Sequence, residues 1–196
     1  MLRRVRRGIL GGTFDPPHLA HLVAAETAYR QLGLDVVTLI PAGSPWQKAE
    51  RPVSDPHHRL AMTELSIDGI DYVEVDAREV RRVGSTYTID TIESFGGDDM
   101  VLIVGADAAA GVRTWHRAAD LLTGVAFAIM PRPGVSVDEV DTAIGPVDIT
   151  WLRTPELAIA STELRARVAG GDSIRFLVTD GVWRYVDAHR LYRGAD

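Results

Sequence analysis

The segment "VRRGILGGTFDPPHLAHLVAAETAYRQLG", residues 5–33, carries the clearest signals of secondary structure in the chain. The apolar run over residues 5–10 is typical of a buried strand, and Gly11-Gly12 after it is typical of a tight turn. Residues 18–33 then place apolar side chains at helical spacing and end at Gly33, the residue type favoured just beyond a helix C-terminus. Strand, glycine turn and helix in direct succession predict the first unit of an α/β fold.

Five further apolar runs have the composition of buried strands. They cover residues 35–41, 71–76, 99–107, 125–132 and 147–153. Because continuous apolar strands alternate with helical segments, we predict a Rossmann-like, doubly wound α/β fold. Its sheet is expected to be mostly parallel, with helices on both faces.

The remaining segments predict helices and two irregular regions. Asp55-Pro56 combines a good N-cap with proline at the first helical position, and so predicts a helix over residues 56–67. Two consecutive helical patterns with no strand between them predict a helical C-terminal end; they cover residues 161–171 and 179–192. The segments that we expect to be irregular, because they are rich in turn residues, are 41–55 and 132–146.

The composition excludes several classes of function. With 196 residues, 46% of them apolar, the chain can bury one sizeable core, and we expect a single domain over residues 1–196. The absence of cysteine excludes disulfides, thiolate zinc sites and cysteine nucleophiles. A net charge of −6 argues against a nucleic-acid partner. No apolar run approaches the ~20 residues of a membrane span, and the basic N-terminus lacks a signal-peptide cleavage pattern, so we expect a cytoplasmic protein without a membrane partner.

The glycine turn and the helix after it form a phosphate-binding pattern. Gly11 and Gly12 let the backbone approach a ligand closely, and a helix beginning near Asp15-Pro16 offers unpaired N–H groups and the positive end of its dipole. The pattern is neither the dinucleotide fingerprint nor the P-loop. We therefore predict a phosphate group, as in a nucleotide, at the carboxyl ends of the strands.

His18 and His21 are three residues apart and share one face at the start of this helix. There they can donate hydrogen bonds to phosphate oxygens and can take up charge beside an anion. Two other interpretations are open: the pair can cap local backbone, or it can bind a metal ion, although no third ligand stands nearby in the sequence. We predict no metal site built by the protein.

The segment GGTFDPPHLAH, residues 11–21, resembles the GGTFDPxHxxH signature of the nucleotidyltransferase superfamily that carries an HxGH-type motif. Ala20 stands where the common motif has glycine. Phosphopantetheine adenylyltransferases are similar but usually carry threonine at the position of His18, which argues against them. The chain is most similar, over nearly its whole length, to the bacterial nicotinate-nucleotide adenylyltransferases of NAD biosynthesis.

The segment IASTELR, residues 159–165, resembles the family's second signature, ISSTxxR, with Ala160 in place of the first serine. On the residues alone, Ser161 and Thr162 are good N-cap residues at a helix start, and Arg165 follows one turn later. The hydroxyls, free backbone donors and guanidinium together predict a second anion site. An ordinary capped helix with a solvated arginine is the alternative interpretation.

Three other segments also match family motifs. Residues 83–92, VGSTYTIDTI, resemble the SxYTxDT segment, and residues 102–121 resemble a strand–GxD–helix block that ends in a tryptophan. Residues 41–48, PAGSPWQK, match a loop whose lysine corresponds to Lys48, whereas Trp46-Gln47 departs from the family's histidine. Without the resemblance, these segments are equally typical of a capped turn, a core tryptophan and a solvated loop.

The resemblance implies transfer of the adenylyl group of ATP to nicotinate mononucleotide, with Mg²⁺ carried by ATP as the only cofactor. The residues that it assigns to catalysis are His18, His21 and Arg165. Those that it assigns to ATP and its phosphates are Gly11, Gly12, Thr13, Phe14, Lys48, Gly105, Asp107, Ser161 and Thr162. Those that it assigns to the nicotinate nucleotide are Thr86, Tyr87 and Trp115.

Two alternatives stay open at this point. Another adenylyltransferase or cytidylyltransferase of the same fold, acting on nicotinamide mononucleotide or phosphopantetheine, would differ in only a few contacts. A non-catalytic ATP-binding module would make the second anion site superfluous. The motifs are compatible with a homo-oligomer as well as with a monomer.

Overall fold

Six parallel strands build the centre of the protein. The computed structural model describes residues 4–43 and 53–193. The strands are β1 (Arg6–Gly12), β2 (Val36–Pro41), β3 (Val73–Val75), β4 (Asp99–Gly105), β5 (Ala126–Met130) and β6 (Ile149–Trp151). They form one sheet in the order β3-β2-β1-β4-β5-β6, and every neighbouring pair is parallel. All six predicted strands are therefore confirmed.

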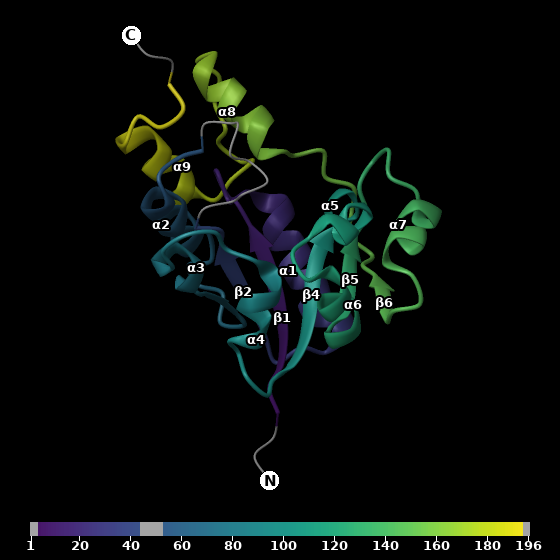
Figure 1. Ribbon diagram of the computed structural model, residues 1–196. Helices are drawn as coiled ribbons and strands as arrows, with labels where there is room; N and C mark the ends of the chain where they lie inside the picture. Colours follow the sequence, from purple (N-terminus) through teal and green to yellow (C-terminus); the bar gives the residue numbers. More distant parts are fainter. Residues whose placement is uncertain (1–3, 44–52, 194–196) are drawn as a thin grey trace.

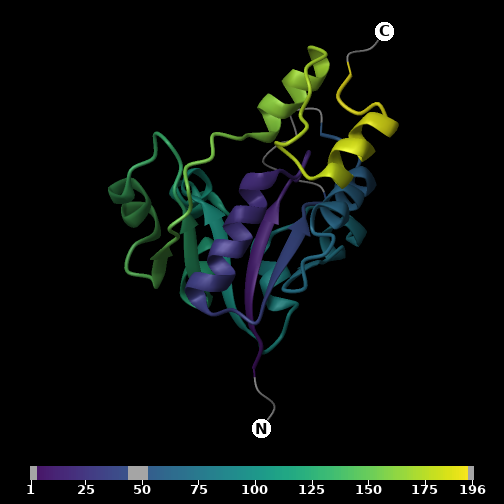
Figure 2. The same ribbon diagram turned by 180° about the vertical axis from the view of Figure 1, so that it is seen from behind.

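Helices cover both faces of this sheet. They are α1 (Leu19–Leu32), α2 (Pro56–Ser66), α3 (Arg78–Arg81), α4 (Thr88–Glu93), α5 (Ala106–Ala110), α6 (Ala118–Gly124), α7 (Val137–Ile144), α8 (Ser161–Ala169) and α9 (Asp180–Ala188), with a 3-10 turn at Val112–Thr114. Figures 1 and 2 show α4 and α6 on one face and α1 on the other, so the doubly wound prediction is confirmed. In the described ranges, no helix has both the length and the apolar character that crossing a bilayer requires.

Each central strand contributes to two cores because successive side chains point to opposite faces. Ile9 and Leu102 pack with α4 and α6, whereas Leu10 and Ile103 pack with α1. Since both faces of the sheet are buried, the strand sequences are continuous apolar runs and do not alternate between apolar and polar residues.

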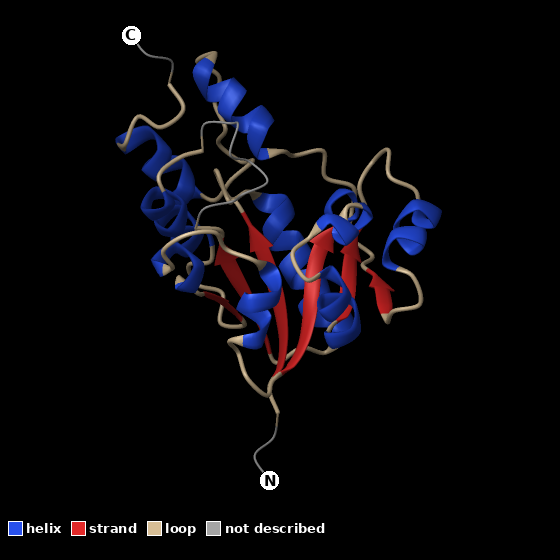
Figure 3. Ribbon diagram, viewed as in Figure 1, coloured by secondary structure: helices blue, strands red, loops and turns tan. Residues whose placement is uncertain are grey.

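The strand order reverses beside β1, because β2 and β3 lie on one side of it and β4 to β6 on the other. Ligands of open α/β sheets bind outside the carboxyl ends of the strands at such a switch point. Figure 3 shows the strand arrows pointing toward the end of the molecule that carries α8 and α9. These helices share a small core with α2, which includes Met62, Leu164 and Val182.

Two of the predicted helix ends are confirmed by their caps. Gly33 has the left-handed conformation, with φ of 60°, and its N–H donates to the carbonyl oxygen of Tyr29. The Asp55 side chain accepts a hydrogen bond from the N–H of His57, and Pro56 is the first residue of α2.

Two local predictions are wrong. Helix α1 begins at Leu19, not near Asp15-Pro16, because Asp15 and Pro16 each precede a proline and such residues disfavour the helical region. The segment 132–146 is not irregular throughout, since it contains α7. A capping box starts α7: Ser136 accepts from the N–H of Glu139, whose side chain accepts from the N–H of Ser136.

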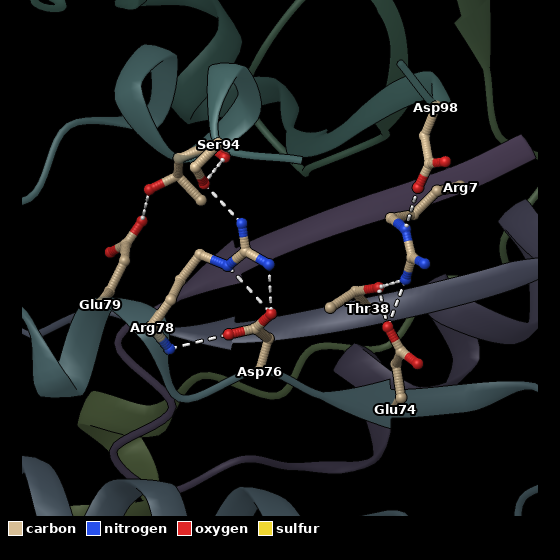
Figure 4. A network of polar contacts seen from close by, with 9 residues as sticks. Arg7, Thr38, Glu74, Asp76, Arg78, Glu79, Ser94 and Asp98 are labelled. Carbon is tan, nitrogen blue, oxygen red and sulfur yellow. Dashed lines mark hydrogen bonds and ion pairs between the residues drawn. The ribbon is translucent and has the colours of Figure 1, made fainter. Parts of the chain in front are cut away.

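Arginines tie the loops around β3 to the sheet (Figure 4). Arg7 on β1 donates to the carboxylate of Asp98 at 3.0 Å and to the hydroxyl of Thr38, and it also pairs with Glu74. Arg78 in α3 donates to Asp76 and lies over the ring of Phe95, with its guanidinium carbon 3.5 Å from the ring centroid. The contacts of Arg78 join the start of α3 to the end of β3 and to Ser94 and Phe95, just beyond α4.

Candidate active site

A cavity of about 760 Å³ opens at the switch point, at the carboxyl ends of β1 and β4. The predicted site residues that line it are Gly11, Gly12, Thr13, Phe14, His18, His21, Thr86, Tyr87, Gly105, Asp107, Trp115, Ser161, Thr162 and Arg165. Lys48 lies outside the described residues. The structure thus brings fourteen positions from four separate sequence segments to one cavity.

The two glycines of the turn meet different surroundings. A Cβ at Gly11 would enter open space, whereas a Cβ at Gly12 would lie 3.0 Å from the ring of Phe14. Phe14 is 1% exposed and has a positive φ of 49°, which is uncommon for a residue with a side chain. Gly12 therefore leaves room for the buried Phe14 ring, which anchors the turn, while Gly11 borders the ligand space.

The rings of His18 and His21 lie against each other at the start of α1, tilted by 30°. His18 is the N-cap residue, His21 is the third helical residue, and their ring centroids are 3.8 Å apart. The backbone N–H of His18 donates to Nδ1 of His21 at 3.1 Å, which assigns the proton of the neutral His21 ring to Nε2. His21 can therefore present an N–H donor at the positive end of α1.

His18 is neutral at physiological pH in the protein without ligand. Burial of the ring, aided by the positive charge of Arg132, lowers the pKa of His18 to about 4. Its Nδ1 is buried without a hydrogen-bond partner among the described residues. This differs from the expectation of a readily charged pair, because a ring that is 3% exposed loses most of its hydration.

The lowered pKa of His18 predicts acid sensitivity of the fold. An unfolded histidine titrates near pH 6.5, so the unfolded chain takes up this proton first as the pH falls. The stability contributed by neutral His18 is present above about pH 6.5 and is lost as the pH falls toward 4. We expect the free energy of urea unfolding to fall by about 2 kcal/mol from this group between pH 7 and pH 5.

His18→Gln tests this prediction because glutamine does not titrate. The variant should lose about 2 kcal/mol less than the wild type over that pH interval. His57→Gln, which removes an exposed histidine at the start of α2, is the matched control. Equal pH dependence in wild type and His18→Gln would contradict a buried neutral His18.

Arg132, at the carboxyl end of β5, is a site residue that the motifs do not reveal. It lines the cavity, and its Nε is buried without an acceptor among the residues that the structure describes. A Cβ at Gly105 would lie 2.6 Å from a carboxylate oxygen of Asp107 and 3.5 Å from this Nε. The sequence signal for Arg132 is its place at the end of the strand predicted over residues 125–132.

The two signature motifs touch each other directly. The hydroxyl of Ser161 donates to the carbonyl oxygen of Pro16 at 2.9 Å, and Arg165 donates from Nη1 to the carbonyl oxygen of Asp15 at 2.8 Å. Arg165 also donates to the hydroxyl of Thr162 at 3.3 Å. The N-cap of α8 is Ala160, so the prediction that Ser161 or Thr162 caps this helix is wrong. Ser161 instead ties α8 to the turn that carries the histidines.

The partly buried carboxyl group of Glu79 lies beside Thr86 in the wall of the cavity. Glu79 accepts a hydrogen bond from Thr91 at 2.7 Å and shares one with Thr86, and burial raises the pKa of Glu79. A ligand carboxylate at Thr86 would therefore compete with Glu79 for the hydroxyl proton.

Two aromatic side chains also line the cavity. Tyr87 stacks on His116, with ring centroids 4.2 Å apart. Trp115 is partly buried and packs on the core that includes the apolar side chains of α4. Glu79 lies outside the motifs read from the sequence, and His116 lies in the block of residues 102–121 but is not among the site residues assigned there.

Carboxylates and histidines do not gather into a metal centre in the described ranges. No group of three or more such side chains is placed to hold a metal ion there. Asp107, in the first turn of α5, lines the cavity and belongs to no such group among the described residues.

Comparison with known proteins decides the family. A family model described as cytidylyltransferase-like matches residues 9–167. A protein of Acidothermus cellulolyticus named "Probable nicotinate-nucleotide adenylyltransferase" is 39% identical over 203 residues, which cover 99% of this chain and 97% of that protein. A protein of the same name from a Thermoanaerobacter species is 41% identical, over 98% and 97% of the two chains. The chain belongs to the nicotinate-nucleotide adenylyltransferase family.

A solved structure shares the fold of this chain. Plasmodium falciparum nicotinic acid mononucleotide adenylyltransferase, complexed with NaAD, matches with a TM-score of 0.80 at 18% identity. The match covers 96% of this chain and 97% of that chain. At this identity the likeness confirms the Rossmann-like fold.

Ala20, which stands in place of the glycine of the nicotinate-nucleotide adenylyltransferase signature, lines a second cavity of about 280 Å³. The start of α1, the end of β5 and residues 154–157 enclose this space, and their side chains are mostly apolar. The two cavities share Met130, Arg132 and Pro133, so they are neighbours.

Proposed function

We propose that this protein transfers the adenylyl group of ATP to nicotinate mononucleotide, forming nicotinate adenine dinucleotide (NaAD) and pyrophosphate. The observation that carries the proposal is the contact between the two motifs. Ser161 and Arg165 bond to the turn that leads into His18 and His21, so donors from both motifs surround one point of the cavity. The names of the curated relatives and the NaAD complex of the Plasmodium falciparum enzyme support the same assignment.

The reaction needs positioning and charge stabilisation rather than a base. An oxygen of the nucleotide phosphate, already ionised, attacks the α-phosphorus of ATP. The bond from that phosphorus to the bridging oxygen breaks, and its electron pair leaves on pyrophosphate. In this proposal His18 and His21 donate to the oxygens around the α- and β-phosphates, while Arg165, Thr162 and the backbone N–H of Ser161 at the start of α8 hold the β- and γ-phosphates.

The adenine of ATP is assigned to the smaller cavity. Its walls are mostly apolar, and Arg132 and Thr154 supply polar groups at its edge. A flat, mostly apolar base with polar edges suits such a site. Because Arg132 lines both cavities, a base in the smaller cavity would lie next to phosphates in the larger one. Asp107, which follows β4, is assigned to a ribose hydroxyl.

Magnesium is proposed as a companion of ATP. When bound, Mg²⁺ neutralises phosphate charge and is held mainly by phosphate oxygens and water. The lack of a three-carboxylate or histidine cluster in the described ranges fits this mode of binding.

The pyridine end is assigned to Thr86, Tyr87 and Trp115, all of which line the larger cavity. We expect Trp115→Ala to raise the KM for nicotinate mononucleotide about tenfold or more, because stacking of a base on an aromatic ring contributes about 1–3 kcal/mol. The KM for ATP should stay within about twofold. Trp115→Phe retains a ring and should recover most of the affinity. Equal KM changes for both substrates in Trp115→Ala would contradict the assignment.

A substrate panel tests the proposed function. The purified chain is incubated with ATP or CTP and with nicotinate mononucleotide, nicotinamide mononucleotide or phosphopantetheine, and pyrophosphate release is followed. We expect the highest rate with ATP and nicotinate mononucleotide. Equal rates with the amide would refute the specificity but not the reaction class. Nucleotide binding without any product would instead indicate an ATP-binding module.

A further inference from the structure

The turn over residues 13–16, here called the phosphate turn, is held by side chains from two distant helices, α2 and α8. Its carbonyl oxygens accept hydrogen bonds from side chains as follows: Thr13 from Arg59 at 2.9 Å, Asp15 from Arg165 at 2.8 Å, and Pro16 from Ser161 at 2.9 Å. An anion site must keep carbonyl oxygens away from the anion, because like partial charges repel. These donors keep three such oxygens occupied.

The phosphate turn also carries a negative charge, at Asp15. This side chain is 2% exposed and borders the cavity. A buried carboxylate is stable only when hydrogen bonds replace its hydration. Its Oδ1 accepts from the hydroxyl of Tyr192 at 2.7 Å, and its Oδ2 accepts from the N–H of Ser54 at 3.2 Å.

Tyr192 reaches Asp15 from the far end of the chain, 177 residues away. After α9 the chain turns back, with Tyr192 at a positive φ of 65°, and its ring packs on the core shared by α2, α8 and α9. Its hydroxyl also lies 3.7 Å from Sδ of Met62. Burial and the charge of Asp15 raise the pKa of Tyr192, so the hydroxyl stays a proton donor.

We propose that Tyr192 is a positioning residue of the phosphate site, which binds the carboxylate of Asp15 and so keeps it turned away from bound triphosphate. This inference rests on the proposed function, because it takes ATP as the ligand of the phosphate turn. Without the tyrosine hydroxyl, Oδ1 would lose its donor, and the carboxylate would keep only the N–H of Ser54 on Oδ2 as a hydrogen-bond donor beside the phosphates.

Tyr192→Phe tests this proposal because it removes one oxygen atom and keeps the ring. Hydrogen bonds to charged groups change an equilibrium by about 10- to 100-fold, so we expect kcat/KM for ATP to fall by that factor, mainly through KM. The KM for nicotinate mononucleotide should stay within about twofold. Binding of inorganic triphosphate, measured by calorimetry, should weaken in parallel.

Tyr185→Phe is the matched control. Tyr185 lies on α9, and its hydroxyl bonds to Nδ1 of His58 at 2.9 Å, away from the residues that line the cavity. The control should show a thermal midpoint change similar to that of Tyr192→Phe with kcat/KM within about twofold of wild type. Equal kinetic effects of the two variants would overturn the proposal.

A double-mutant cycle with Asp15→Asn shows whether Tyr192 acts through the carboxylate. If it does, adding Tyr192→Phe to Asp15→Asn should change kcat/KM for ATP by less than about threefold. A loss of tenfold or more in that background would overturn the proposal. This comparison stays decisive even if Tyr192→Phe alone is unstable, because the neutral amide leaves no unpaired charge. If the wild-type protein showed no transfer activity, the proposed function would be refuted. The binding of inorganic triphosphate to the wild type and to Tyr192→Phe would still test the positioning role of Tyr192.

Discussion

His18→Ala should lower kcat by about 10²–10³-fold while the fold is kept. The ring of His18 is 3% exposed, sits at the N-cap of α1 and lines the cavity, and its lowered pKa keeps it neutral. A neutral, preorganised donor gains strength as negative charge builds up on the transferring phosphoryl group and the leaving pyrophosphate. Its loss should therefore appear in kcat more than in the KM for ATP.

The control for His18→Ala is His189→Ala. His189 lies at the end of α9 against His58 and Tyr185, outside the residues that line the cavity. This variant should turn over within about twofold of wild type. Steady-state kinetics and circular dichroism together separate loss of catalysis from loss of fold. Near-wild-type turnover of His18→Ala would refute its assigned role.

Arg165→Ala should lower kcat/KM for ATP by a similar factor, about 10²–10³-fold. This guanidinium joins the two motifs, because it donates to the carbonyl oxygen of Asp15 and to the hydroxyl of Thr162. Its planar fork has further N–H groups for phosphate oxygens. Arg165→Lys keeps the charge but not the fork, so we expect an intermediate loss of about tenfold.

Helix α8 offers a matched control for Arg165. Arg167 lies two residues further along, and its Nε donates to the carbonyl oxygen of Ser173 on the protein surface. Arg167→Ala removes an equal charge without touching the cavity and should leave kcat/KM within about twofold. Similar losses in the two alanine variants would mean that the net charge of α8 matters, not the position of Arg165.

The sequence predicts the sheet well because its signals are local and strong. Six buried strands, the C-terminal glycine of α1 and the Asp-Pro start of α2 each follow from residue type and spacing. The motif residues that line the cavity are also predictable, because carboxyl ends of parallel strands converge at the switch point.

The errors arise where neighbouring signals compete. Two consecutive prolines delay α1 to Leu19, although the Asp-Pro pair by itself resembles a helix start. The turn residues of 132–146 conceal α7, although Ser136 and Glu139 have the spacing of a capping box.

The contacts that hold the site cannot be predicted from local sequence. Tyr192 bonds to Asp15 over 177 residues, and Arg59, although it lies in a predicted helix, donates to Thr13 across 46 residues. The neutral state of His18 depends on burial and on Arg132, which follows β5 more than 100 residues further along the chain. Such contacts arise from packing in three dimensions, for which one sequence carries no periodic signal.

The fate of the α-phosphorus of ATP distinguishes adenylyl transfer from the other possible reactions. The chain is incubated with nicotinate mononucleotide and with ATP radiolabelled at either the α- or the γ-phosphorus, and the products are separated. Adenylyl transfer predicts that the α-label appears in nicotinate adenine dinucleotide and the γ-label in pyrophosphate, in equal amounts. Transfer of the γ-label to the acceptor, or retention of both labels in ATP, would contradict the account.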